Sequence, residues 1–143
     1  MKIFLASDHA AFHEKNLLLE YLKIHHEVID LGTYSADSTH YPEWAKKLVE
    51  KVREEQVPGI LLCGSGIGVS MVANRYHGIR AALCRDSDDA KMSRLHNNAN
   101  ILCLSGRKTS VDDLKQICDT FLETEFEGGR HQIRIDQFND LGE

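Results

Sequence analysis

The sequence predicts an α/β fold of three layers, in which helices cover both faces of a parallel, Rossmann-like sheet of five strands. Five short apolar runs alternate with segments whose apolar residues recur at helical spacing. Those segments are long enough for crossover helices, which join strands that run in parallel. The strands are expected at Lys2–Ser7, Glu27–Leu31, Gly59–Cys63, Arg80–Cys84 and Asn100–Leu104.

Amphipathic segments between the strands predict the helices. The clearest segment places Ala45, Leu48 and Val52 on one face, with Pro42 near the first turn. Similar faces run through residues 11–22 and 111–122, and residues 69–76 can start another helix. After two glycines, a C-terminal helix is expected over residues 130–140. Because no linker or repeat interrupts the 143 residues, we expect a single domain over residues 1–143.

Composition argues against several classes of partner. The formal net charge is −5 and no basic stripe is present, so nucleic acid is not an expected partner. No signal peptide and no apolar stretch of membrane-spanning length is found, so a soluble, cytoplasmic protein without a membrane partner is expected. The cysteines form no Cys-x-x-Cys pair and the eight histidines are scattered, so we expect no metal. Three cysteines are assigned to the core: Cys84, Cys103 and Cys118.

A glycine-rich loop over residues 63–68, Cys-Gly-Ser-Gly-Ile-Gly, follows the third strand. Its glycines allow the backbone to turn sharply and to aim several N–H groups into one cavity, as anion sites do. The loop does not match Gly-x-Gly-x-x-Gly, because Val69 occupies the last required position, and no Walker motif follows. A nucleotide site is therefore only weakly supported.

Polar side chains cluster where the strands of the predicted sheet end. Because ligands bind at the carboxyl ends of parallel strands, these residues could move protons on a small anionic substrate. We assign to this edge the groups Ser7-Asp8-His9, Gly32-Thr33, Cys63-Gly64-Ser65 and Ser105-Gly106-Arg107, together with His96-Asn97-Asn98.

Each of these residues also has a purely structural interpretation. Asp8 and Ser65 could cap the helices that follow them, and Cys63 could be a small buried apolar side chain. The segment at His96 could be a polar turn. Two arginines at i and i+4 of the last helix could be solvated, or could deliver guanidinium groups to a phosphate.

Seven blocks of sequence, in order along the chain, resemble the ribose-5-phosphate isomerase B family, which includes allose-6-phosphate and galactose-6-phosphate isomerases. The resemblance runs from Lys2 to about Arg134. The blocks are Ser7-Asp8-His9-Ala10, Asp30-Leu31-Gly32-Thr33, Tyr41-Pro42, Cys63-Gly64-Ser65-Gly66-Ile67-Gly68, Gly78-Ile79-Arg80-Ala81, His96-Asn97-Asn98-Ala99-Asn100 and Glu127-Gly128-Gly129-Arg130-His131.

The resemblance implies an aldose–ketose isomerase that acts on a sugar phosphate through a cis-enediolate, with no metal or organic cofactor. It implies a homodimer, often paired into a tetramer, whose active site lies at the dimer interface and is built from both subunits. Cys63 matches the catalytic base, in a branch of the family distinct from members that use a glutamate. His96 matches the residue that opens the sugar ring, and Asp8 a contact that handles hydroxyl protons.

The resemblance also implies the substrate contacts. Ile133 stands where some members have a polar or basic residue, and we expect it to face away from the phosphate. Ser65 and the loop amides match an anion hole for the enediolate. The matched binding residues are Gly64, Gly66 and Gly68 in that hole, His9, Arg107, Arg130 and Arg134 at the phosphate, and Tyr41 and Asn97 elsewhere on the substrate.

The leading hypothesis is therefore interconversion of ribose 5-phosphate and ribulose 5-phosphate. A six-carbon substrate, allose 6-phosphate or galactose 6-phosphate, is the alternative within the same chemistry. A non-catalytic phosphate- or nucleotide-binding module is a second alternative, supported by the loop and opposed by the missing fingerprints. A redox or metal protein would need paired ligands, which the spacing does not provide.

Overall fold

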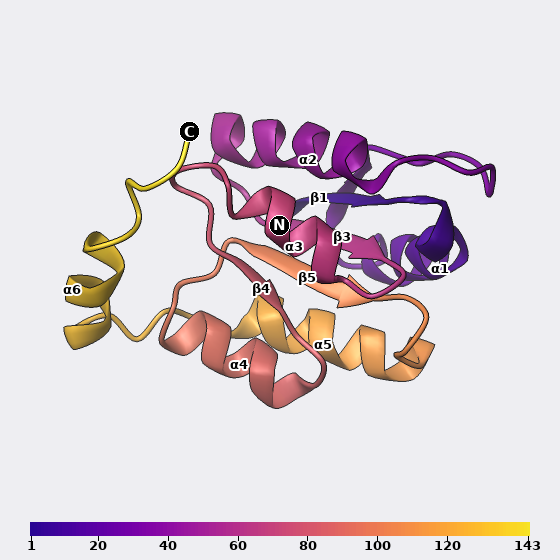
Figure 1. Ribbon diagram of the computed structural model, residues 1–143. Coiled ribbons are helices and arrows are strands. Elements are labelled where there is room, and N and C mark those ends of the chain that lie inside the picture. The colour runs from indigo at the N-terminus through magenta and orange to yellow at the C-terminus, as the bar shows by residue number, and fades with distance from the viewer.

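The computed structural model describes residues 1–143 and has a parallel five-stranded sheet at its centre (Figure 1). The strand order is β2-β1-β3-β5-β4, so β3 lies in the middle and β2 and β4 form the edges. This confirms the predicted α/β sheet. The strands are β1 (Lys2–Ser7), β2 (Glu27–Asp30), β3 (Gly59–Cys63), β4 (Ala81–Leu83) and β5 (Ile101–Ser105).

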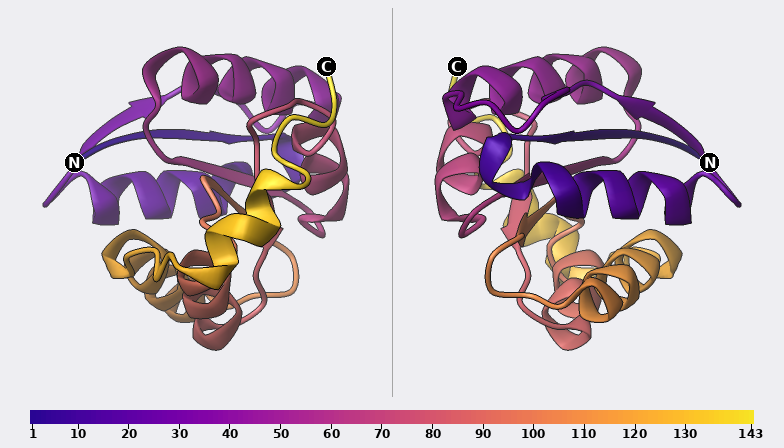
Figure 2. Two further views of the ribbon diagram at one scale, coloured as in Figure 1. Left: turned by 90° about the vertical axis from the view of Figure 1, so that its left-hand side faces the viewer. Right: turned by 90° about the vertical axis from the view of Figure 1, so that its right-hand side faces the viewer.

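Helices cover both faces of the sheet, as the sequence predicts. Residues of α1, α4 and α5 form one apolar cluster with the sheet, and residues of α2 and α3 form another on the opposite face. Helix α6 lies outside both layers, beyond one end of the sheet in Figure 1 and across the front of the left-hand view of Figure 2. The helices are the short 3-10 helix η1 (His9–Ala11), α1 (Phe12–Leu22), α2 (Tyr41–Glu55), α3 (Ile67–Ala73), α4 (Ser87–Leu95), α5 (Val111–Glu123) and α6 (Arg130–Asp136).

The central strands are apolar throughout because both of their faces are buried. In β3, Ile60 and Leu62 pack with α1 and α5, whereas Leu61 and Cys63 pack with α2 and α3. All five residues of β3 are buried, and so are those of β5. This two-sided burial is typical of parallel sheets, and it explains why these runs do not alternate with polar residues.

Helix α4 was not among the predicted helices, and the other observed elements differ from the predicted ones mainly at their ends. The edge strands β2 and β4 are shorter than expected, because each has a ladder partner on one side only. Helix α6 ends at Asp136 rather than at residue 140. There the amides of Phe138 and Asn139 both donate to the carbonyl of Ile135, which closes the chain into turns. Helix α3 begins two residues earlier than expected, at Ile67.

Apart from its two edge strands, the parallel sheet has two sides across which all the strands begin or end. We call the side where the strands end the carboxyl edge, and the side where they begin the amino edge. Each crossover helix brings the chain back from the carboxyl edge to the amino edge. Helix α4 therefore ends at the amino edge, and α6 lies beside that edge as well (Figure 1). No helix in the structure combines the length and apolarity needed to cross a membrane.

Candidate active site

A cleft of about 570 Å³ opens at the carboxyl edge of the sheet. It lies above the ends of β1, β3 and β5, where the topology brings three polar loops together. Most of the residues predicted for the site lie here. The lining includes Asp8, His9, Tyr41, Cys63, Gly64, Ser65, Gly68 and Arg107.

The thiol of Cys63 stands at the end of β3 and faces into the loop that follows it. The amide of Gly66 donates a hydrogen bond to its sulfur at 3.1 Å. Gly66 has φ of 77°, and a Cβ there would lie 2.6 Å from Leu83 Cδ1 and 2.9 Å from the backbone carbon of Leu104. Only glycine fits this tight backbone turn, which directs the amide of Gly66 toward the sulfur of Cys63. A thiolate accepts such a bond better than a thiol does.

The glycine loop also offers backbone donors that the chain itself leaves unused. The amides of Gly64, Ser65 and Gly68 donate no hydrogen bond within the protein, although all three residues line the cleft. Gly68 lies against the ring of Tyr41, and a Cβ there would come within 2.6 Å of Tyr41 Cε1. The loop is therefore equipped to receive a negatively charged oxygen beside the thiol.

Asp8 caps the helix that follows it, so its structural interpretation is confirmed, whereas the N-cap of α3 is Gly66 and Ser65 lies one residue before it. Ser65 Oγ accepts from the amide of Ile67 at 3.2 Å, and Asp8 Oδ1 accepts from the amide of Ala10 at 3.0 Å. These hydrogen bonds occupy one acceptor on each side chain and leave each residue on the cleft wall. A contact with substrate is compatible with both hydrogen bonds.

His9 is fixed in one tautomer by its backbone neighbour. The amide of Thr39 donates to His9 Nδ1 at 3.1 Å, so Nδ1 is the unprotonated nitrogen of the neutral ring. The proton is then on Nε2, which is free to donate. Because His9 lines the cleft, it can offer this N–H to an anionic group of a ligand.

The loop after β5 closes the other wall of the cleft. The amide of Arg107 donates to the carbonyl of Gly64 at 3.1 Å, and Ser105 Oγ donates to the same carbonyl at 2.7 Å. Lys108 adds a second cation beside Arg107, and Met71 lines the wall formed by α3. Neither was predicted. Lys108 could have been predicted because it directly follows Arg107 in the sequence, whereas no sequence pattern indicates Met71.

Four of the predicted site residues lie elsewhere, at the amino edge. The assignment of His96-Asn97-Asn98 to the carboxyl edge is wrong, because a segment that precedes a parallel strand lies where the strands begin. The contacts of this segment agree, since the carbonyl of Asn98 accepts from Arg80 Nε at 2.8 Å, just before β4. The predicted residues absent from the cleft lining of this chain include His96, Asn97, Arg130 and Arg134.

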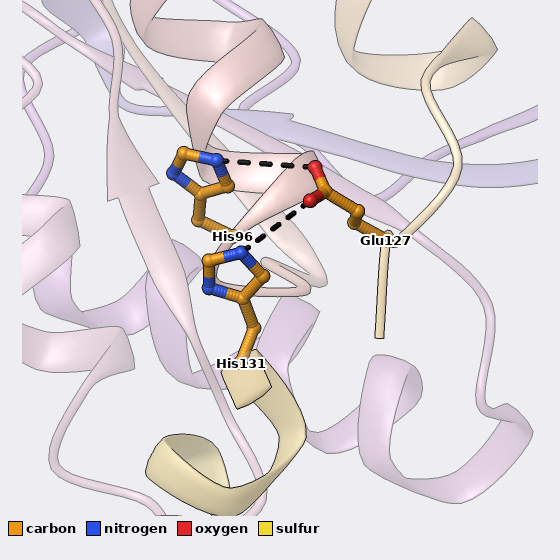
Figure 3. A group of neighbouring side chains, drawn as sticks. All are labelled: His96, Glu127 and His131. Carbon is orange, nitrogen blue, oxygen red and sulfur yellow. Dashed lines mark ion pairs between the residues drawn. The ribbon is translucent and has the colours of Figure 1, made fainter. Parts of the chain in front are cut away.

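At the amino edge, two histidines and a glutamate meet (Figure 3). The rings of His96 and His131 stack with centroids 4.3 Å apart and planes inclined by 17°. Glu127 directs one oxygen to each ring, 4.0 Å from His96 Nε2 and 3.7 Å from His131 Nε2. His131 is buried, and its Nε2 has no hydrogen-bond partner. Burial, with His96 and Arg130 nearby, lowers the pKa of His131.

These three side chains are the one group of potential metal ligands that the structure brings together, with donor atoms within 4.8 Å of one another. Spacing rules miss the group because His96 is remote in the sequence from Glu127 and His131, which are only four residues apart. The geometry suits a metal poorly, because the Nε2 lone pairs lie in the planes of two stacked, nearly parallel rings, and these planes do not meet at a point between them. Arg130 and Arg134 also add positive charge near the group.

Comparison with known proteins gives consistent matches along almost the whole chain. The family model described as Ribose/Galactose Isomerase matches residues 3–138. Ribose-5-phosphate isomerase B of Escherichia coli is 39% identical over 137 residues, which cover 94% of this chain and 92% of the relative. A crystal structure of a ribose 5-phosphate isomerase from Thermotoga maritima superposes with a TM-score of 0.94 at 51% identity, covering 96% of this chain and 97% of that one. The ribose-5-phosphate isomerase B of Mycoplasma genitalium, solved with bound ribulose-5-phosphate, gives a TM-score of 0.92 at 43% identity, covering 95% and 92% of the two chains.

Proposed function

Because the chain belongs to the ribose/galactose isomerase family, we propose that it interconverts ribose 5-phosphate and ribulose 5-phosphate by proton transfer through a cis-enediolate. The observation that carries the proposal is the thiol of Cys63 beside three unused loop amides, all within one cleft. The solved relative with bound ribulose-5-phosphate supports the choice of substrate.

In this proposal Cys63 is the base that moves the proton between the first two carbons of the sugar. A hydrogen on a carbon next to a carbonyl is only weakly acidic, so the enediolate oxygen must be stabilised as it forms. The amides of Gly64, Ser65 and Gly68 supply that stabilisation, and a single such donor is typically worth about 3 kcal/mol in the transition state. The Gly66 amide holds the sulfur in place.

The phosphate is held by hydrogen-bond donors and cations, which fix the distance between the reacting carbons and the thiol. The cleft itself supplies His9, through its Nε2 proton, and Arg107. The remaining cations of the proposed grip, Arg130 and Arg134, lie on α6 at the opposite edge of this chain.

We therefore place the active site between two copies of the chain. One copy contributes the cleft at its carboxyl edge, and the other contributes the residues at its amino edge, including the ring-opening His96. A two-fold symmetric dimer then contains two identical sites, each built from both subunits. The separation of the two residue groups within one chain is the observation that favours this assembly.

Substitution of the thiol tests the chemistry. Cys63→Ala and Cys63→Ser are expected to lower kcat by about 10²- to 10⁴-fold, the usual contribution of a positioned base, while the fold is retained. Cys84→Ser, which alters a buried thiol away from the cleft, serves as the control. Near-normal turnover in either Cys63 variant would remove this residue from the mechanism.

Mixing inactive variants tests the assembly. In a mixed dimer of Cys63→Ala and His96→Ala, one of the two sites has no substitution, so random mixing should restore about a quarter of the normal activity. The control mixes Cys63→Ala with Asp8→Ala. Both of these residues lie at the carboxyl edge, so every mixed site contains a substitution and no activity should return. Equal recovery in the two mixtures would contradict a shared site.

Substrate range is tested by comparing kcat/KM for ribose 5-phosphate, allose 6-phosphate and galactose 6-phosphate. We expect the five-carbon substrate to be preferred. Arg130→Ala and Arg134→Ala should act mainly through KM, since both side chains are assigned to the phosphate. An unchanged KM in both variants would refute that assignment.

A further inference from the structure

We propose that Glu127 and His131 are positioning residues for His96, which hold its ring plane and keep a proton on its Nε2. This inference rests on the proposed function, in which His96 opens the sugar ring. Neither residue was assigned a role from the sequence, although both belong to the block of residues 127–131 that resembles the family.

The arrangement of the carboxylate is the first support. Glu127 presents one oxygen to each imidazole, and in both rings the facing atom is Nε2 (Figure 3). The separations of 3.7 and 4.0 Å exceed a hydrogen bond. The carboxylate side chain is 48% exposed, more than either ring, so it has room to rotate toward them. Once it closes, the buried Nε2 of His131 gains the partner that it lacks.

The stacking supplies the second support. His131 is anchored in α6 with its side chain only 6% exposed, whereas that of His96 is 41% exposed. A buried flat ring 4.3 Å away therefore limits the rotation of the more exposed ring. His131 can perform this role without charge repulsion, because burial and its cationic neighbours disfavour its protonated form.

The charged groups around the pair agree with this division of roles. Glu127 approaches from the segment after α5, and Arg130 and Arg134 act from α6. The one arginine of α4, Arg94, is directed elsewhere, donating to the carbonyls of Thr124 and Ala99. Glu127 is thus the one carboxylate that the structure places against both rings.

A proton held on Nε2 leaves Nδ1 of His96 as the acceptor, on the side of the ring away from Glu127 (Figure 3). Nδ1 can take the proton of the anomeric hydroxyl and return a proton to the ring oxygen as the bond between that oxygen and the anomeric carbon breaks. His96 then ends neutral, as it began. The carboxylate stabilises the transient imidazolium, as in other carboxylate–imidazole pairs.

The test uses the full-length protein and the variant Glu127→Ala, with Glu125→Ala as a matched control in the same exposed segment. By ¹H–¹⁵N NMR, we expect a slowly exchanging Nε2–H signal for His96 in the wild type and in the control, and its loss in Glu127→Ala. His131→Phe, which keeps a flat ring against His96, should retain more activity than His131→Ala.

The kinetic arm separates ring opening from enediolate chemistry. In Glu127→Ala, kcat/KM for ribose 5-phosphate should fall by about 10- to 100-fold, the usual effect of losing an orienting partner. Exchange of the C1 hydrogen of ribulose 5-phosphate with solvent requires Cys63 but no ring opening, so it should change by less than about 3-fold.

Three outcomes would overturn the inference: an unchanged Nε2–H signal in Glu127→Ala, an equal loss of both reactions, or stoichiometric binding of Zn²⁺ that this variant abolishes. The last would reassign the group to a metal site. Failure of the proposed function can be told apart from failure of this inference. Absence of isomerase activity in the wild type would refute the function, whereas the NMR signal reports the contact between Glu127 and His96 whether or not the protein is active.

Discussion

Replacement of Gly66 by alanine would test two reasons why this position needs glycine: its positive φ and the lack of space for a Cβ. Gly66 has φ of 77°, and Gly78 has φ of 78°, so alanine at either position meets the same conformational penalty. Around Gly78 a Cβ would find no atom within 4 Å, whereas at Gly66 it would collide with Leu83 and with the backbone of Leu104. The pair is therefore a matched comparison.

The expected magnitudes follow from these contacts. Gly78→Ala should lower the free energy of unfolding by about 1–2 kcal/mol, the cost of a left-handed conformation for a residue with a Cβ. Gly66→Ala adds overpacking, worth about 1–3 kcal/mol, because one of its neighbours is backbone in the central sheet and cannot rotate away. The total at Gly66 should reach about 2–5 kcal/mol.

The assay is urea denaturation of both variants and the wild type at one protein concentration, so that any effect of association is constant. Gly66→Ala should also lower kcat, since relief of the collision moves the amide that contacts the sulfur of Cys63. Equal losses of stability in Gly66→Ala and Gly78→Ala would refute the packing argument and leave only the shared conformational term.

Three further predictions concern buried titratable groups. Iodoacetamide should modify only Cys63 in the native protein, as mass spectrometry can show. Burial raises the pKa of Cys84 to about 12 and also raises the pKa of the other two core thiols, which keeps all three protonated and unreactive. Modification of any core thiol would contradict this prediction. Because the pKa of His131 is lowered in the folded state, its contribution to stability should be complete above about pH 6.5 and decline as the pH falls below that value. Urea denaturation at pH 7.5 and about pH 5.5 should show a smaller acid loss in His131→Phe than in the wild type, and equal losses would refute the assignment. Lys15→Met should lower the free energy of unfolding by about 3 kcal/mol in the same assay, because Lys15 is fully buried and pairs with Asp30 at 2.8 Å. A decrease below about 1 kcal/mol would show that the ion pair is not needed for stability.

Much of the architecture could be predicted because the signals are local. β1 and β3 have the bounds expected from the sequence, since each is a continuous apolar run in the middle of a sheet buried on both faces. The ends of the edge strands and of α6 could not be placed as well. They depend on how many neighbours the segment finds and on where the chain turns, which apolar spacing does not encode.

The residues of the candidate site also fall into those that the sequence could place and those that it could not. Residues at the end of a strand or directly after it, such as Cys63 and Asp8, were placed correctly, because the end of a parallel strand fixes the edge on which they lie. His96 precedes a strand and was placed at the wrong edge. The cluster of His96, Glu127 and His131 was missed altogether, since it forms only when the chain folds back on itself after α5.

The placement of the two residue groups at opposite edges has a consequence for how activity would arise during the life of the protein. On the proposed assembly, a newly folded single chain already has its stable sheet but no complete site. Catalytic output at low concentration would then rise with the square of the amount of chain, because every site requires an encounter between two copies. A copy altered in one residue group would disable only one of the two sites that it shares, whereas a copy altered in both groups would also disable the site to which its intact partner contributes.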